Sequence, residues 1–320
     1  MQTQTSQFRL LTRSDFDGLV CAVLLKELDM LGDVTFVHPK DMQDGVIDVT
    51  ANDILTNVPY VDGCHLCFDH HASEQSRIGE TAENHVLDPK AASAARVVYD
   101  YYGGKQRFPS IGDEIMAAVD KADSARFTRG EILNPEKWVL LSFLMDSRTG
   151  LGRFRDFSIS NYDLMMQLID FCRDHSIDEI LNLPDVQERV DLYRAHEELA
   201  KAQILRCSTV HDNLVVLDLR EEETIYATNR FTIYSLFPDC NISIHVLWGK
   251  QRQNTVFTIG KSILDRSCAT DIGDLCLKYN GGGHAAAGTC QVSHEDAVRV
   301  QQELIERINA DAGSEFSSVR

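Results

Sequence analysis

Two aspartates, Asp15 and Asp17, stand two residues apart between a short apolar run and an apolar-periodic stretch. This order predicts a strand, a tight loop and a helix, and Gly18 directly after the pair permits tight backbone geometry. Two carboxylates in such a loop can bind neighbouring metal ions, or they can form an acidic turn that caps the helix. Sites in α/β sheets tend to lie at the carboxyl ends of strands, which favours metal binding.

A second polar group, Asp69-His70-His71, directly follows the apolar run Leu66-Cys67-Phe68. Three potential ligands or acid-base groups therefore leave the end of another predicted strand together. Histidine and carboxylate in combination suit manganese, iron or zinc, whereas calcium and magnesium sites are normally all oxygen. A purely structural role is the alternative for this segment alone.

Two further aspartates are weaker candidates for the same chemistry. Asp53 stands just before Ile54-Leu55-Thr56-Asn57, and Asp123 follows an apolar-periodic helical stretch. Each alone is typical of a surface position, and Asp48 and Asp120 compete for the same roles.

Three consecutive glycines, Gly281, Gly282 and Gly283, precede His284 and a run of small residues. Consecutive glycines allow the backbone to approach a ligand closely, and successive amides can form an anion-binding concavity. We therefore expect a tight binding loop here, with a flexible hinge as the alternative.

The elements that position these residues follow from hydrophobic periodicity. Strands are expected near 8–12, 34–38 and 64–68, with helices over 91–102, 111–122, 137–145 and 162–173. Pro184 can start a long connecting helix, and strands at 214–217, 242–248 and 255–259 with helices at 228–236, 271–279 and 294–310 follow it. The predicted fold is α/β with two domains: a parallel-sheet domain over 1–183, a connecting helix over 184–206, a smaller α/β domain over 207–312 and a disordered tail over 313–320.

Composition narrows the class of protein. The 320 residues are 43% hydrophobic and 25% charged, which is typical of globular proteins, and no run is long and apolar enough for a membrane span. Nine scattered cysteines favour a reducing, cytoplasmic location. The formal net charge of −18 opposes salt-driven binding to long nucleic acids. A small anionic substrate is compatible with this charge if metal ions, backbone amides and a few arginines bind it, with Arg13 and Arg266 as the candidates.

With these residues identified, the sequence resembles the DHH phosphoesterase superfamily, in particular its members with a DHH-associated C-terminal domain. The resemblance rests on the ordered set of motifs around Asp15, Asp53, Asp69, Asp123 and Gly281, which spans nearly the whole chain. Such relatives include oligoribonuclease-like phosphodiesterases, adenosine bisphosphate phosphatases, cyclic-dinucleotide hydrolases and single-strand exonucleases.

The resemblance implies a role for each motif residue. Two manganese ions would be bridged by Asp53, with Asp15 on one side and Asp17, His70 and Asp123 on the other. Asp69 would orient the site and His71 would face the substrate phosphate, so these two are the expected catalytic residues. Gly281, Gly282, Gly283 and His284, with Arg13 and Arg266, would bind the substrate.

One position departs from the family pattern. Many relatives carry a metal-binding histidine shortly before the first aspartate, where this chain has Leu11-Thr12-Arg13-Ser14. Arginine keeps its proton and cannot ligate a metal, so the first of the two metal sites is expected to be weaker, completed by water or another side chain, or empty without substrate.

The activity expected from the resemblance is hydrolysis of short linear oligonucleotides or dinucleotides, such as pGpG or pApA, to mononucleotides. An adenosine bisphosphate phosphatase, an exopolyphosphatase-like phosphohydrolase and a non-catalytic nucleotide-binding regulator are the alternatives. No long nucleic acid and no membrane is expected as a partner, and a homodimer is left open.

Overall fold

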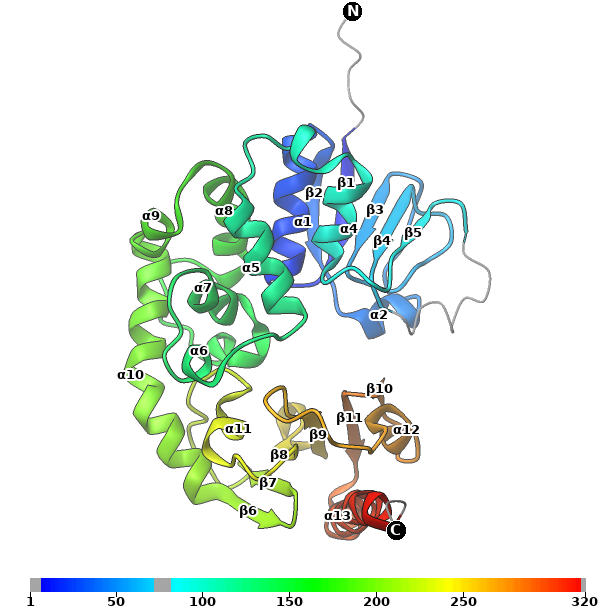
Figure 1. Ribbon diagram of the computed structural model, residues 1–320, viewed down its shortest axis with the longest axis vertical. Coiled ribbons are helices and arrows are strands. Elements are labelled where there is room, and N and C mark those ends of the chain that lie inside the picture. The colour runs from blue at the N-terminus through cyan, green and yellow to red at the C-terminus, as the bar shows by residue number, and fades with distance from the viewer. Residues whose placement is uncertain (1–6, 72–81, 318–320) are drawn as a thin grey trace, which may run out of the picture. The chain divides into compact units, whose positions relative to one another are not determined.

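The computed structural model describes residues 7–71 and 82–317, which form two compact units (Figure 1). The first unit holds the chain up to Arg126 together with Pro135–Arg194, and the second holds Phe127–Asn134 and the chain from Ala195 onward. The predicted α/β fold is confirmed. The predicted boundaries at 183, 206 and 312 remain predictions, and they did not anticipate that 127–134 pack with the second unit.

The first unit is built on a sheet of five parallel strands in the order β2-β1-β3-β4-β5. Because all strands run the same way, the residues that follow them meet at one edge. The strands are β1 (Phe8–Thr12), β2 (Leu31–Phe36), β3 (Asp53–Thr56), β4 (Leu66–Asp69) and β5 (His85–Leu87).

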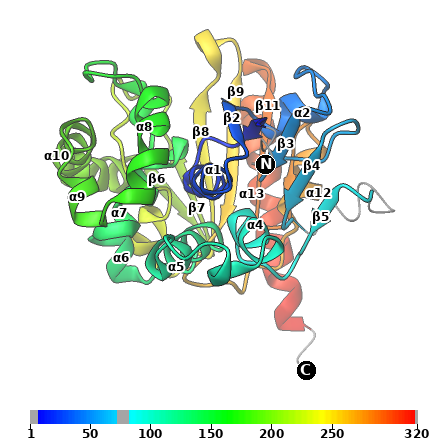
Figure 2. The ribbon, with the colours of Figure 1, turned by 90° about the horizontal axis from the view of Figure 1, so that it is seen from above.

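Helix α1 (Phe16–Glu27) is the central helix of this unit. Its residues 16–25 are all buried, as expected for a helix that is apolar on every side. Figure 2 views α1 along its axis, with α4 and α5 beside it, and α1 contacts both of them and α8. The helices here are α2 (Pro39–Gln43), α4 (Ala94–Tyr101), α5 (Asp113–Asp123), α7 (Lys137–Met145), α8 (Asn161–Asp174) and α9 (Ile177–Leu181), with short 3-10 helices at Gly104–Gln106, Ser147–Thr149 and Leu151–Arg153.

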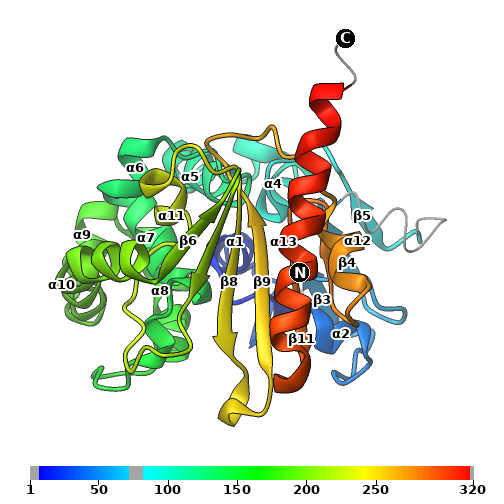
Figure 3. The ribbon, with the colours of Figure 1, turned by 90° about the horizontal axis from the view of Figure 1, so that it is seen from below.

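The second unit contains a mixed sheet of six strands in the order β10-β11-β9-β8-β7-β6, in which only the β7–β8 pair is parallel. Helix α13 (His294–Ser317) packs across one face of this sheet through Val300, Leu304 and Ile308 (Figure 3). The strands are β6 (Ser208–His211), β7 (Leu214–Asp218), β8 (Ile242–Trp248), β9 (Thr255–Lys261), β10 (Gly282–His284) and β11 (Ala287–Val292). The remaining helices are α6 (Arg129–Leu133), α11 (Thr232–Leu236) and α12 (Ile272–Leu277), with a 3-10 helix at Lys250–Arg252.

The predicted connecting helix is α10 (Pro184–Cys207). The expected disordered tail is described only in part, because α13 continues to Ser317 and 318–320 lie outside the described residues. None of the described helices combines the length and apolar character needed to cross a membrane.

Candidate metal centre

The loop after β1 places two aspartates at the carboxyl edge of the parallel sheet. Asp15 is the N-cap of α1, and its side chain accepts a hydrogen bond from Gly18 N at 3.0 Å. A Cβ at Gly18 would lie 2.1 Å from the Arg13 carbonyl oxygen, so only glycine lets the loop close so tightly. Asp17 then lies in the first turn of α1.

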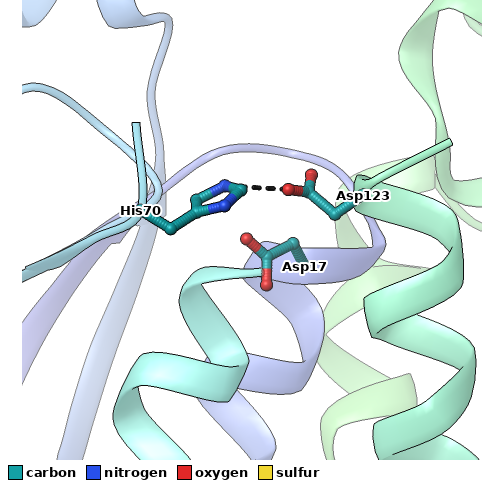
Figure 4. A group of neighbouring side chains, drawn as sticks. All are labelled: Asp17, His70 and Asp123. Carbon is teal, nitrogen blue, oxygen red and sulfur yellow. Dashed lines mark ion pairs between the residues drawn. The ribbon is translucent and has the colours of Figure 1, made fainter. Parts of the chain in front are cut away.

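Three side chains from three different elements converge beside this loop. Asp17 comes from α1, His70 directly follows β4, and Asp123 is the last residue of α5. Each offers one ligand atom, and these atoms all lie within 4.8 Å of one another. Figure 4 shows the three side chains pointing toward one another.

Helix α4 holds the Asp17 carboxylate in place. Both oxygens accept backbone hydrogen bonds from its first turn, from Ala94 N at 3.0 Å and from Ala95 N at 2.8 Å. Burial raises the pKa of the Asp17 carboxyl well above its ordinary value, and the nearby Asp123 carboxylate raises it further. A cation bound between the two carboxylates would act in the opposite direction and favour their ionised forms.

His70 and Asp123 form an ion pair, with Nε2 of the imidazole 2.8 Å from Oδ2 of the carboxylate. Burial lowers the pKa of His70, but the hydrogen bond and charge of Asp123 outweigh it and raise this pKa to about 9. The other ring nitrogen, Nδ1, lies 3.3 Å from the Ala91 carbonyl oxygen. When Nδ1 carries the proton and donates a hydrogen bond to that carbonyl, Nε2 has a lone pair that can bind a metal ion.

Asp69 orients both histidines of its motif. Its Oδ1 atom accepts from the backbone of His70 at 2.8 Å and lies 2.7 Å from Nδ1 of His71. Asp69 is 1% exposed, whereas the side chain of His71 is 37% exposed. A buried carboxylate thus fixes the orientation of an imidazole that solvent can reach.

The donor set fits one divalent transition-metal ion. Ligand distances of about 2.0–2.2 Å place the atoms around an ion roughly 3–4.4 Å apart, which is compatible with the observed group. One imidazole nitrogen and two carboxylate oxygens suit manganese, iron or zinc better than calcium.

Asp15 is engaged by other side chains instead. Its Oδ2 lies 3.3 Å from Nε of Arg13, and Nδ2 of Asn57 donates to its Oδ1 at 3.3 Å. Asn57 directly follows β3, is 1% exposed and has a positive φ of 55°. Burial raises the pKa of Asp15, and Arg13 and Gly18 act against this rise.

A second arginine, Arg148, stands near the carboxylates of this edge. Its guanidinium binds both oxygens of Asp146, with Nε to Oδ1 and Nη2 to Oδ2 each at 2.7 Å. Its charge lowers the pKa of Asp15, and the charges of Asp15 and Asp123 help to raise the pKa of Arg148. Arg148 is therefore a cation within electrostatic reach of the site.

Comparison with known proteins identifies the family. No family model and no curated protein matches the chain. Among solved structures, a pGpG-specific phosphodiesterase from Vibrio cholerae, PggH, is 62% identical with a TM-score of 0.81, and the match covers 95% of this chain and 100% of that one. The chain belongs to the DHH phosphoesterase family.

Two more distant structures share the fold of this DHH phosphoesterase. An exopolyphosphatase-related protein from Bacteroides fragilis is 11% identical with a TM-score of 0.50, covering 95% of this chain and 93% of that one. RecJ in complex with Mn²⁺ from Thermus thermophilus is 13% identical with a TM-score of 0.51, covering 96% of this chain and 52% of that one. At such identities the likeness shows the fold alone.

The assignment of Asp53 as a bridging metal ligand is wrong. Asp53 is the first residue of β3, so it lies at the amino edge of the sheet, opposite the group around Asp17. Arg9 binds both of its oxygens, with Nε at 2.7 Å and Nη2 at 2.8 Å, and Thr50 N donates to Oδ2 at 2.7 Å. These contacts lower the pKa of Asp53 despite burial, which acts in the opposite direction, and they make it a structural carboxylate.

Sequence analysis did not identify two residues near the carboxyl edge of the parallel sheet. Asn57 stands at the carboxyl end of β3, four residues after Asp53, and the strand's bounds would have pointed to it. Arg148 lies far along the chain from every motif, and no local pattern marks it.

Four of the predicted substrate residues of the second unit, Gly281 to His284, lie on or next to a short edge strand. Gly282–His284 form β10, which pairs with β11, so the expected loop is a hairpin. A Cβ at Gly281 or Gly283 would lie 2.3 Å from a carbonyl oxygen of β11, which explains both glycines structurally. His284 and Arg266 are exposed, and their binding role remains a prediction.

Proposed function

We propose that this DHH phosphoesterase is a metal-dependent phosphodiesterase that hydrolyses short linear dinucleotides to mononucleotides, with pGpG as its preferred substrate. The observation that carries the proposal is the convergence of Asp17, His70 and Asp123 within 4.8 Å. The choice of pGpG rests on the 62% identity with a pGpG-specific phosphodiesterase over the full length of that chain.

We infer that manganese is the working ion and that one ion is held tightly. Asp17, His70 and Asp123 would hold it, and their one imidazole nitrogen and two carboxylate oxygens suit manganese. Asp15 already receives donors from Gly18, Arg13 and Asn57, so a second ion would bind at least about tenfold more weakly. When bound, a divalent ion polarises the phosphate and lowers the pKa of a coordinated water.

The chain's own residues would position the phosphate and move protons. Asp69 keeps the His71 ring oriented, so His71 can donate a hydrogen bond to a phosphate oxygen or pass a proton to the leaving ribose oxygen. Arg13 and Arg148 supply positive charge beside the acidic group, which reduces repulsion between the site and an anionic substrate.

A substrate panel tests this function. The chain would be incubated with pGpG, pApA, adenosine 3′,5′-bisphosphate and polyphosphate, each with manganese, magnesium, cobalt or zinc, and products would be separated by chromatography. We expect fastest turnover of pGpG to GMP with manganese. Faster release of phosphate from the bisphosphate or polyphosphate would identify a phosphatase instead, and binding without turnover would identify a regulator.

The cytoplasmic location suggested by the nine free cysteines stays a prediction.

A further inference from the structure

A pocket of about 100 Å³ lies within the first unit, next to the loop that carries Asp15. Ser14, the residue before Asp15, forms part of its wall, and the turn with Asp146 and Ser147 forms another part. Because Ser14 directly precedes Asp15, the N-cap of the helix that carries Asp17, the pocket adjoins the candidate metal centre.

The pocket's walls suit a flat ring. Leu144, Met145, Leu151 and Met165 line it, and each of these side chains is at most 8% exposed. Apolar and thioether groups pack favourably on aromatic faces.

The polar groups of the pocket suit the edge of a purine. Asp146 is one of the lining residues, and its carboxylate oxygens can only accept hydrogen bonds. Asn161 is another lining residue, and because its Oδ1 accepts from Arg189 Nε at 3.2 Å, its amide nitrogen is the group that can donate to a ligand. An acceptor pair beside a donor matches guanine, which presents N1–H and N2–H donors next to the O6 acceptor. Adenine presents N1 as an acceptor and N6 as a donor, the reverse of this pattern.

We propose that this pocket binds a guanine base of the substrate and that Asp146 and Asn161 determine base preference; this inference rests on the proposed dinucleotide phosphodiesterase function. Guanine N1–H and N2–H donate to the two Asp146 oxygens, and Asn161 donates to O6. Asp146 is thereby a specificity-determining residue.

Guanine binding exchanges one partner of Asp146 for another. Arg148 now donates to Oδ1 through Nε and to Oδ2 through Nη2, and its backbone N–H also donates to Oδ1 at 2.9 Å. These bonds use at least three of the four acceptor positions of the carboxylate, so guanine must displace the guanidinium fork. The released guanidinium then donates to a substrate phosphate oxygen. Adenine cannot replace the fork, because its N1 lone pair would face the carboxylate.

The test measures equilibrium binding of GMP and AMP by calorimetry in the presence of Mn²⁺. We expect wild-type protein to bind GMP at least about tenfold more tightly than AMP, the discrimination typical of a bidentate base contact. Asp146→Asn should reduce this ratio at least tenfold, because the new amide group can donate to adenine N1 and accept from N6. Asparagine also caps a turn as well as aspartate does, which protects the fold.

A second variant obstructs the pocket without changing its polar groups. A Cβ at Gly152, which lines the pocket, meets no atom within 4 Å, so Gly152→Leu adds bulk at low steric cost. It should weaken GMP binding about tenfold. The matched controls are Asp178→Asn, which changes an exposed aspartate paired with Lys137, and Gly112→Leu, which changes an exposed glycine that also has open space. Both controls should bind GMP and AMP as wild type does.

Equal affinity of wild type for GMP and AMP, or an unchanged ratio in Asp146→Asn, overturns the guanine pocket. Unaltered GMP binding by folded Gly152→Leu overturns it as well. These readouts involve no turnover. If the protein binds GMP more tightly than AMP but does not cleave pGpG, the guanine pocket is supported and the proposed function is contradicted. If wild type cleaves pGpG but Asp146→Asn leaves the ratio of GMP to AMP affinity unchanged, the proposed function is supported and the guanine pocket is contradicted.

Discussion

Among the described residues, Asp15 has three hydrogen-bond or ion-pair partners, Gly18, Arg13 and Asn57. A single substitution of Asn57 can replace its favourable contact with Asp15 by charge repulsion. Its Nδ2 donates to the Asp15 carboxylate at 3.3 Å, while its own Oδ1 is buried without a hydrogen-bond partner among the described residues. Asn57→Asp would replace a donor by a second buried carboxylate, so we expect metal-free protein to lose about 1–3 kcal/mol of unfolding free energy. A second divalent ion should then bind more tightly than in wild type, because it would neutralise the added charge.

Thermal unfolding with and without Mn²⁺, together with metal analysis, checks this prediction. The control is Asn52→Asp, the same change at an exposed turn of the same unit, which should alter neither quantity. Equal stability of the metal-free Asn57→Asp and wild-type proteins would show that Asp15 does not depend on a neutral donor.

The sequence identified individual site residues only where a motif falls at the end of a predicted strand or helix. Asp17, His70 and Asp123 follow or end periodic segments, and the structure brings them together. Asp53 stands at the start of a strand, and four residues of extended chain span about 13 Å. Its order among the motifs therefore did not predict that it lies at the opposite edge of the sheet from the other site residues. Arg148 reaches the site by tertiary packing, which no local pattern encodes.

At the scale of elements, backbone N–H groups in the first turn of α4 donate hydrogen bonds that hold the Asp17 carboxylate. Ser93 is its N-cap, accepting from Arg96 N at 3.0 Å and donating to Asp120 at 2.8 Å. Ser93→Ala should cost about 1 kcal/mol of stability through loss of the cap and loosen the turn that donates to Asp17. We therefore expect Mn²⁺ affinity to fall about tenfold, within the range for groups that orient ligands.

Ser160→Ala is the matched control, because Ser160 caps α8 in the same manner by accepting from Asp163 N at 3.0 Å. Chemical denaturation should show a similar loss of stability in both variants, and titration with Mn²⁺ should show weaker binding only in Ser93→Ala. Equal Mn²⁺ affinities in the two variants would refute the role of α4.

Long periodic elements were predicted well from the sequence, and several short ones were not. The expected helix over 137–145 has those bounds, and the expected connecting helix becomes α10, because both carry sustained apolar spacing. Strands β3, β5 and β10 have three or four residues, too few for a period to register. The helix expected over 228–236 shrinks to Thr232–Leu236, since Asn229 instead donates to the Ile132 carbonyl oxygen at 2.9 Å and accepts from Phe231 N at 3.1 Å.

At the scale of the whole molecule, the net charge of −18 makes local cations important for any anionic substrate. We propose that His284 of the second unit binds the end of the substrate remote from the scissile bond. His284→Ala should then raise KM for pGpG about 10- to 100-fold with little change in kcat, as expected for a charge-assisted hydrogen bond of about 1.5–3 kcal/mol.

Steady-state kinetics on pGpG and on bis-p-nitrophenyl phosphate check this prediction. The shorter substrate lacks the remote end, so His284→Ala should hardly affect its hydrolysis, and His211→Ala serves as the control in the same unit. An equal loss on the two substrates would mean that His284 does not bind a remote end.

The most direct measurement of the central claim is the conversion of pGpG to GMP by wild-type protein and by His70→Ala, each with Mn²⁺ and with a chelator. His70 supplies the one nitrogen of the group with Asp17 and Asp123, so its loss should slow turnover at least about 100-fold. His175→Ala, a change at an exposed histidine of the same unit, is the control and should retain activity. We predict complete conversion by wild type with Mn²⁺, none with the chelator, and almost none by a folded His70→Ala protein. Wild-type turnover by folded, metal-analysed His70→Ala would contradict the account.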